Sequence, residues 1–268
     1  MPSQKIFVTG ATGYISRVVS EQAVQAGHSV RGLSRRPEGD ELLPKLGSIP
    51  VRGTLTDFPI LARESRTADM VFHLVFDHDW SQPYEQLLKL EPDALDAIAR
   101  VLIGTNKPLV TTSGTLIVAP DPDGGETDET APLLERPILP RHLAEEHALA
   151  YAARGVRVTA NWLPQYVCGR ETPHGFAAES IKLAARSGES AFVGDGEHYC
   201  SSVCVDDAAR LYFPVAEGAG AGEVFNGTGN TDTTYRAMAT AIGKTVGVPV
   251  AERLKKEIQS GMLTPGLL

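Results

Sequence analysis

The stretch VTGATGYIS, residues 8–16, decides the fold class of this chain. It overlaps an apolar run typical of a β-strand, KIFVTG, and leads into a segment with helical periodicity that begins near Tyr14. Gly10 allows a tight turn, and Gly13 lets the backbone approach a pyrophosphate held at the positive end of the helix. The stretch predicts a dinucleotide-binding loop, whose expected contacts are Gly10, Thr12, Gly13, Tyr14 and Ile15.

Apolar, β-rich runs alternate with helical segments as far as residue 165. We expect strands at 5–10, 29–34, 49–54, 68–76, 108–114 and 155–164, and helices at 16–27, 83–102 and 144–155. This alternation predicts an α/β fold with a Rossmann-like, doubly wound parallel sheet. The acidic, Pro- and Gly-rich segment 120–133 is typical of an exposed loop. The alternation then weakens, which indicates a nucleotide-binding domain at 1–165 and, integrated with it, a small substrate-binding lobe at 166–268.

The composition excludes several classes of protein. A net charge of −8 argues against a basic surface for nucleic acid or anionic lipid. The three cysteines form no CxxC pair, which argues against a disulfide framework or a zinc site. A strand begins by Lys5 and no apolar run reaches the roughly 20 residues that span a bilayer, so we expect neither a signal peptide nor a membrane segment. A cytoplasmic location without metal, membrane or nucleic-acid partners is the prediction.

The end of the second strand indicates which nucleotide fits. A carboxylate there would bind the ribose 2′-hydroxyl of NAD and repel a 2′-phosphate, but this chain carries Ser34, Arg35 and Arg36. The alternative is that both arginines are ordinary solvated surface charges. The pattern favours NADP(H) as the cofactor.

Five motifs occur in an order that resembles the extended and atypical short-chain dehydrogenase/reductase superfamily, the NAD-dependent epimerase/dehydratase-like proteins. They are TGATGYIS, the arginines after the second strand, VFHLVF, VTTSGT and LPQYVCG. The resemblance covers most of the chain and points to an atypical subgroup. It implies a Rossmann fold with a C-terminal substrate lobe and a site where the fourth, fifth and sixth strands meet. It also implies cofactor contacts from His73, Leu74, Val75 and Pro164, with His73 packed beside the pyrophosphate rather than catalytic.

The catalytic residues of that superfamily are only partly matched. A serine or threonine after the fifth strand binds the reacting oxygen, and Ser113 stands at the matching place. Its alternative is a turn serine that caps the strand end. The proton donor comes from a Tyr-x-x-x-Lys pair, and aligning on Glu145 puts Pro137 in place of the tyrosine and Arg141 in place of the lysine. Arg141 can keep a ribose contact, but its permanently charged guanidinium cannot donate the proton.

A second alignment does not restore the pair, since aligning on Glu146 offers Ile138 and His142. Tyr166, two residues after Pro164, is the best substitute donor, although an aromatic ring here also fits plain packing against cofactor or core. Asp77 and His78 could instead act as an acid/base pair or form part of a solvated loop. Adjacent positions diverge, so these two do not predict a metal site.

These observations predict an NADP(H)-dependent oxidoreductase, a reductase or dehydrogenase that acts on a small carbonyl, enone or imine of a biosynthetic pathway. Hydride addition to an enone or iminium needs less help from an acid, which makes the missing tyrosine tolerable. One alternative is a non-redox isomerase, cyclase or dehydratase on the same fold. Another is a catalytically silent nucleotide sensor or binding protein. The expected partner is a small-molecule substrate, and a homodimer stays open because members of the superfamily often dimerise through two helices.

Overall fold

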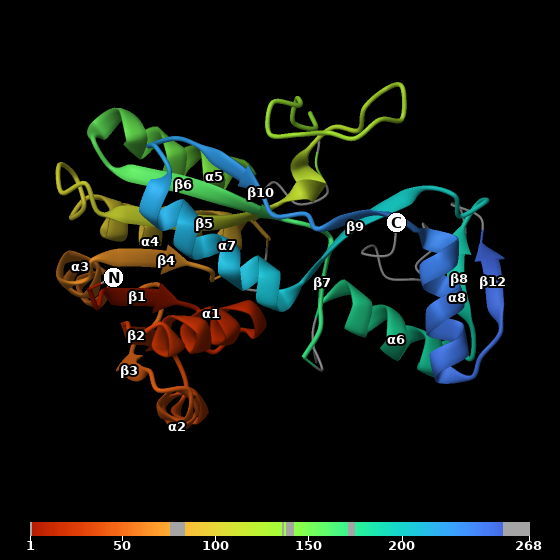
Figure 1. The fold of residues 1–268 in the computed structure, drawn as a ribbon, viewed down its shortest axis with the longest axis horizontal. Helices are drawn as coiled ribbons and strands as arrows, with labels where there is room; N and C mark the ends of the chain where they lie inside the picture. Colours follow the sequence, from red (N-terminus) through yellow and green to blue (C-terminus); the bar gives the residue numbers. More distant parts are fainter. Residues whose placement is uncertain (1, 76–83, 136, 138–141, 171–174, 254–268) are drawn as a thin grey trace. The chain divides into compact units, whose positions relative to one another are not determined.

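The computed structural model of the chain describes residues 2–75, 84–135, 137, 142–170 and 175–253 (Figure 1). These residues form two compact units. The first contains Met1–Leu163 and Asp206–Gly227, and the second contains Pro164–Val205 and Thr228–Leu268. In the described part of the chain, no helix is both long enough and apolar enough to cross a membrane.

The first unit is built on a seven-stranded sheet in which every neighbouring pair is parallel. Its strands, in spatial order, are β3 (Ile49–Arg52), β2 (Ser29–Ser34), β1 (Lys5–Thr9), β4 (Met70–His73), β5 (Pro108–Gly114), β6 (Arg157–Leu163) and β10 (Val224–Asn226). This order confirms the predicted α/β fold with a Rossmann-like, doubly wound sheet. The direction of strand addition reverses between β1 and β4, and ligands of such sheets bind at that point, beyond the carboxyl ends of the strands.

Helices cover both faces of this sheet. They are α1 (Tyr14–Gln25), α2 (Pro37–Lys45), α3 (Phe58–Thr67), α4 (Tyr84–Ala99), α5 (His142–Leu149) and α7 (Val205–Gly218). Phe7, Val71 and Leu109 of the strands pack into one buried cluster with Leu95 and Ile98 of α4.

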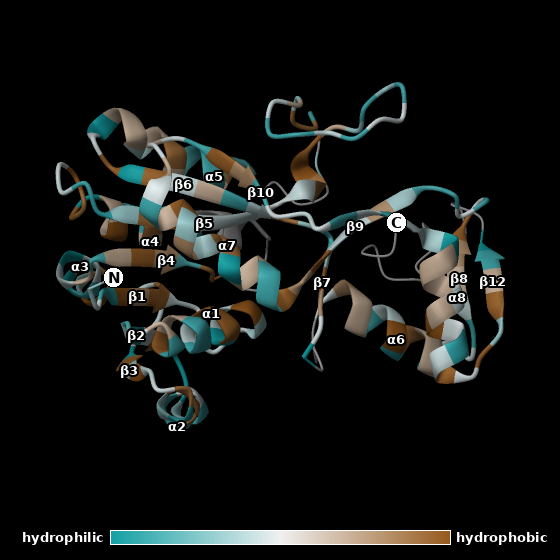
Figure 2. Ribbon diagram, viewed as in Figure 1, coloured by the Kyte–Doolittle hydropathy of each residue, from teal (hydrophilic) through white to brown (hydrophobic). Residues whose placement is uncertain are grey.

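On the opposite face, the ring of Phe72 in β4 meets Tyr212 of α7 with ring centroids 5.7 Å apart. The hydropathy colours in Figure 2 follow this layering, since β1 and β4 are largely hydrophobic whereas α1 carries both colours. The buried residues of α1 include Ser16, Val19 and Ala23, whose spacing of three and four residues places them on one side of the helix.

Among its described residues, the second unit contains two small sheets and two helices. One sheet has the order β11 (Asn230–Thr234), β9 (Tyr199–Cys204) and β7 (Tyr166–Cys168), and the other pairs β12 (Val250–Arg253) with β8 (Ser190–Val193). The helices are α6 (Phe176–Ser187) and α8 (Tyr235–Val246). Two short 3-10 helices, η1 (Thr115–Ile117) and η2 (Ala150–Arg154), belong to the first unit.

The segment 206–227 departs from the sequence-based boundaries, which assign it to the C-terminal lobe. Its strand β10 pairs with β6 and so extends the sheet of the first unit to a seventh strand, where the sequence predicts six. The three residues Val224–Asn226 are too few to show a periodicity of their own, and the strand exists because β6 offers an open edge. The predicted loop at 120–133 is irregular, apart from one bridge between Val118 and Leu133.

Candidate cofactor and substrate site

The loop between β1 and α1 is a close-packed backbone turn. Gly10 adopts a positive φ of 66°, and the backbone amide of Gly13 donates to the Gly10 carbonyl over 2.8 Å. A Cβ on Gly10 would lie 3.0 Å from Cα and Cβ of Val75, which follows the end of β4. Both the conformation and the space therefore require glycine at this position, as a dinucleotide-binding turn does.

Gly13 is the N-terminal cap of α1 and is exposed. A Cβ here would lie 3.0 Å from the Gly10 carbonyl oxygen, on the surface that a bound pyrophosphate would approach. The first turn of α1, which includes Tyr14 and Ile15, contains no acidic residue, and amides in the first turn of a helix lack partners within the helix. Thr12 is half-buried beside them. These residues fit an anionic dinucleotide backbone at this helix end.

The end of β2 carries a buried serine followed by two exposed arginines. The Ser34 hydroxyl donates to the Arg36 carbonyl over 3.0 Å, which holds the chain as it turns into α2. Asp40, in the first turn of α2, is paired with Arg52 at the end of β3, and hydrogen bonding to this arginine lowers the pKa of Asp40. Asp40 therefore has a cation as its partner, and Arg35 and Arg36 are two exposed guanidinium groups directly after β2.

The end of β4 is anchored to the strands on either side. His73 is buried, and its Nδ1 lies 3.0 Å from the hydroxyl of Thr9 in β1. Its carbonyl accepts a hydrogen bond from the hydroxyl of Thr112 in β5. Leu74 and Val75 follow half-buried, with Val75 against the Gly10 turn. His73 thus supports the strand ends, and the cofactor contacts predicted for these three residues stay a prediction.

The end of β5 presents three consecutive hydroxyl side chains, and two of them hydrogen-bond to other protein atoms. Thr111 donates to the Thr159 carbonyl over 3.0 Å, and Thr112 lies 2.6 Å from the hydroxyl of Tyr212. Ser113 is 7 % exposed, and its buried hydroxyl has no hydrogen-bond partner among the described residues. A buried hydroxyl without a protein partner costs about 1–3 kcal/mol, and several other buried hydroxyls share this state. Ser113 differs from them in its place at the carboxyl end of β5, where ligands of such sheets bind.

A buried polar contact joins β6 to α5 next to Ser113. Trp162, the register partner of Ser113, donates from its indole nitrogen to Oε2 of Glu145 over 2.8 Å, and both side chains are buried. In the sequence, Glu145 serves only to align this segment with the family pattern. The available signal is its place between two alanines that also face the core, Ala144 and Ala148, where a solvated glutamate is not expected.

Pro164 and Tyr166 belong to the second unit. Tyr166 is 3 % exposed and packs its ring edge-on against Phe176. Burial, followed by the nearby Tyr235 and Cys200, raises the pKa of Tyr166 far above its ordinary range. The phenol therefore stays protonated at neutral pH, where it can donate a hydrogen bond but gives up its proton reluctantly.

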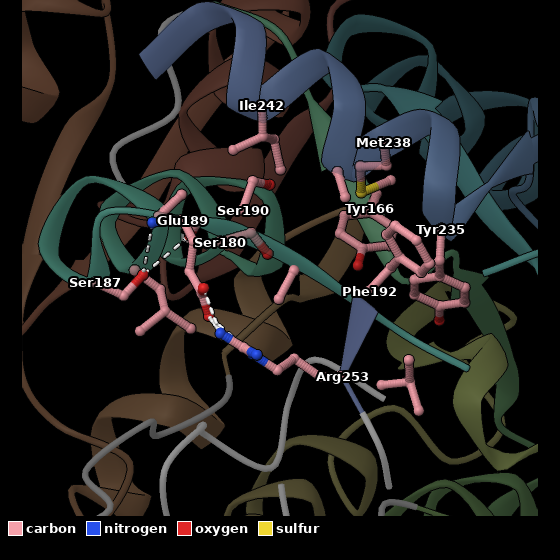
Figure 3. A pocket seen from close by; sticks show the side chains of 15 residues that line it. Tyr166, Ser180, Ser187, Glu189, Ser190, Phe192, Tyr235, Met238, Ile242 and Arg253 are labelled. Atoms are coloured by element: carbon pink, nitrogen blue, oxygen red, sulfur yellow. Dashed lines mark hydrogen bonds and ion pairs between the residues drawn. The ribbon is translucent and has the colours of Figure 1, made fainter. Parts of the chain in front are cut away.

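Tyr166 also lines a hollow inside the second unit, about 620 Å³ with its open mouth included (Figure 3). At one end Tyr166 and Tyr235 lie together with Phe192, and the Tyr235 hydroxyl donates to Gln165 over 2.7 Å. At the other end Arg253 and Glu189 form an ion pair, with 2.9 Å between Arg253 Nε and Glu189 Oε1. Apart from Tyr166, these lining residues have no local sequence signal, because they come together only when α6, α8 and β8 pack.

Three of the predicted catalytic residues, Asp77, His78 and Arg141, lie outside the described residues. Within the described ranges, no group of three or more His, Cys, Asp and Glu side chains is arranged to hold a metal ion.

This chain is similar to a protein family and to individual curated proteins over most of its length. The model of a family described as "NAD dependent epimerase/dehydratase family" matches residues 6–226. Among curated proteins, the uncharacterized protein C2A9.02 of Schizosaccharomyces pombe is 35% identical over 246 residues, which cover 92% of this chain and 82% of the relative. A 4-hydroxy-2-methyl-3-oxo-4-farnesyl-3,4-dihydroquinoline-1-oxide ketoreductase of Stigmatella aurantiaca is 27% identical over 91% of this chain and 74% of its own length.

Among solved structures, that of gox2253 superposes with a TM-score of 0.82, covering 99% of this chain and 86% of the other. The two sequences are only 20% identical, so this likeness concerns the fold alone.

Proposed function

The chain belongs to the NAD-dependent epimerase/dehydratase family, within the extended short-chain dehydrogenase/reductase superfamily, and on this premise we propose that it is an NADP(H)-dependent oxidoreductase of small carbonyl, enone or imine compounds. The single observation that carries the proposal is the buried Ser113 hydroxyl, which has no partner in the described part of the protein. It stands at the carboxyl end of β5, on the sheet edge that also carries the Gly10 turn. The ketoreductase relative supports the reaction class.

The residues that would hold the cofactor are those of the β1–α1 loop, the end of β2 and the end of β4. Gly10, Thr12, Gly13, Tyr14 and Ile15 leave room and amide groups for the pyrophosphate. Val75 borders the same turn, His73 and Leu74 precede it at the end of β4, and Pro164 is the contact expected after β6. When bound, the nicotinamide supplies the hydride.

The 2′-phosphate is assigned to the arginines after β2. Arg35 and Arg36 are exposed, and of the two carboxylates in the first turn of α2, Glu38 and Asp40, Asp40 is paired with Arg52. A guanidinium–phosphate contact is charge-assisted and bidentate, so this end of the sheet favours NADP(H) over NAD(H).

Ser113 is assigned the role of donating a hydrogen bond to the reacting oxygen of the substrate. As charge develops on that oxygen, a hydroxyl fixed at the end of a rigid strand donates a hydrogen bond at no cost of reorganisation. Tyr166 is the proposed substitute proton donor, although its raised pKa favours hydrogen bonding over full proton transfer. Arg141 is assigned a ribose contact, and the pair Asp77 and His78 is the reserve acid/base group.

A non-redox isomerase, cyclase or dehydratase is the second candidate. It is favoured by Pro137, which stands where the family pattern has its tyrosine, and by the reluctance of the Tyr166 phenol to release its proton. In such an enzyme the same groups would polarise the substrate without net hydride transfer.

The test is turnover with deuterium-labelled NADPH on a panel of small ketones, enones and cyclic imines. The proposal expects NADPH to be consumed and its deuterium to appear at carbon in the reduced product. Product formation without NADPH consumption would establish the second candidate instead. If NADPH binds tightly but keeps its deuterium with every compound of the panel, the result would favour a catalytically silent nucleotide sensor.

A further inference from the structure

Two of the three cysteines face each other on neighbouring strands of the second unit. β7 and β9 run parallel, and their register pairs Tyr166 with Ser202, Val167 with Val203 and Cys168 with Cys204. Because paired positions in a sheet project to the same face, the two thiols stand on one side of the strand pair. Both cysteines are exposed.

The two sulfur atoms are also close to each other's chain. Sγ of Cys168 lies 3.8 Å from the carbonyl oxygen of Val203, the residue before Cys204. Sγ of Cys204 lies 3.5 Å from the position that a Cβ on Gly169, the residue after Cys168, would take. Although Cys168 is exposed as a residue, partial loss of solvent around its thiol, and after that the neighbouring Cys204 thiol, raises the pKa of Cys168.

This geometry suits a covalent link. Neighbouring strands lie about 4.8 Å apart, which falls within the roughly 4.4–6.8 Å between Cα atoms that disulfides span. From these observations we propose that Cys168 and Cys204 form a reversible redox modification site, which hydrogen peroxide converts to a disulfide. The proposal stands independently of the function proposed above.

The reaction balances with one peroxide. The Cys204 thiolate attacks one peroxide oxygen, the O–O bond breaks, and sulfenic acid and hydroxide form. The Cys168 thiolate then attacks the sulfenic sulfur, forms the S–S bond and expels a second hydroxide. The two protons released by the thiols convert both hydroxides to water, so two thiols and one peroxide give one disulfide and two waters. The balance is the same if the two cysteines exchange roles.

Cys200 is set apart from this pair. It is buried, and its thiol donates to the Thr233 carbonyl over 3.2 Å. It lies four residues before Cys204 on the same strand, or about 13 Å at the usual rise per residue, which is too far for a disulfide. Cys200 therefore supplies an internal control.

The pair also has a distinctive place in the chain. The polypeptide passes from the first unit to the second at Leu163–Pro164 and returns at Val205–Asp206. Cys168 follows the first crossing by five residues and Cys204 precedes the second by two. A disulfide would tie together the strands that enter and leave the second unit.

The experiment uses the full chain, reduced and then treated with stoichiometric hydrogen peroxide. Thiols titrated after denaturation should fall from three to one. A digest without reductant should contain a Cys168–Cys204 linked peptide that dithiothreitol removes. Cys200→Ser, which keeps a hydrogen-bond donor at that position, should still lose two thiols, whereas Cys168→Ser and Cys204→Ser should form no linked peptide.

Other results would overturn the proposal. These are an unchanged thiol count, a linked peptide that contains Cys200, oxidation that stops at sulfinic acid, or links only between separate chains. If a variant does not fold, the peptide map of the wild-type chain decides alone.

Discussion

Three consecutive residues at the end of β5 carry hydroxyl groups, and they differ in what they bind. Thr111 and Thr112 hydrogen-bond to protein atoms, whereas Ser113 does not among the described residues. We predict that Ser113→Ala lowers kcat/KM at least about tenfold, or about 1.4 kcal/mol of transition-state stabilisation. The unfolding free energy should not fall, because the hydroxyl has no partner to lose. Ser113→Thr should restore much of the rate, and an Ala variant at full activity would remove the reacting oxygen from this strand end.

The charge after β2 is tested by Arg35→Asp. Losing a charge-assisted contact of about 1.5–3 kcal/mol should weaken NADPH binding by roughly ten- to a hundredfold, with a much smaller effect on NADH. The measurement is the ratio of the two dissociation constants. Arg66→Asp is the matched control. This exposed arginine lies in the last turn of α3, which leads into the amino end of β4, away from the carboxyl ends of the strands. Equal losses for NADPH and NADH would contradict the assignment.

The β1–α1 turn is tested by comparing two glycines. Gly10 and Gly27 both have positive φ, 66° and 87°, so alanine at either position carries a left-handed cost of about 1–2 kcal/mol. A Cβ at Gly27 meets nothing within 4 Å, whereas at Gly10 it lies 3.0 Å from Val75. We predict that Gly10→Ala weakens the binding of both NADPH and NADH, whereas Gly27→Ala lowers only the unfolding free energy. Unchanged nucleotide affinity in a folded Gly10→Ala protein would show that the turn does not hold the cofactor.

The attachment of α3 to β2 depends on one buried carboxylate. Burial would raise the pKa of Glu64, but hydrogen bonds from Arg31 and Arg63 outweigh it and leave that pKa below its ordinary 4.5. Arg31 Nε lies 2.5 Å from Glu64 Oε2. A lowered pKa means that the stabilisation is complete above the unfolded pKa and is lost as the pH falls through the folded pKa.

Glu64→Gln should therefore lower the unfolding free energy by about 1–3 kcal/mol at pH 7. The difference from wild type should shrink below about pH 4.5, as the wild-type carboxylate is protonated. Denaturant unfolding across this pH range is the measurement. Glu179→Gln, which affects only exposed surface pairs with Lys182 and Arg186, should cost less than about 1 kcal/mol. A difference independent of pH would rule out the charged contact.

The elements that sequence patterns predict are those with long apolar runs. β1, β2, β5 and β6 fall within one or two residues of their expected ranges, because each buried strand has its own apolar signal. α2 and α3 are missed, since each is short and contains a proline that weakens the helical signal. β10 is missed because its three residues form a strand only by pairing with distant β6.

The candidate site divides in the same way. The Gly10 turn and the arginines after β2 can be predicted because their local sequence determines what they can bind. The sequence cannot predict that Thr111 and Thr112 hydrogen-bond within the protein, because their partners lie 48 and 100 residues away. For the same reason it cannot predict that Ser113 differs from them. The contact between Trp162 and Glu145 is likewise a result of packing between β6 and α5.

Taken as a whole, the first unit carries every described feature assigned to the nucleotide, apart from Pro164. The parallel sheet brings the ends of β1, β2, β4 and β5 to one edge, so the pyrophosphate turn, the arginines, the His73 segment and Ser113 share that edge although they span 104 residues of sequence. The central claim is that this edge binds NADP(H).

Equilibrium titration of the full wild-type chain with NADPH and with NADH, followed by nucleotide fluorescence, tests that claim most directly. We predict saturable binding of both nucleotides, with NADPH bound at least about tenfold more tightly, since a phosphate contact of about 1.4 kcal/mol or more separates them. Absence of NADPH binding at about 1 mM, where an interaction of about 4 kcal/mol would be half-saturated, would contradict the account.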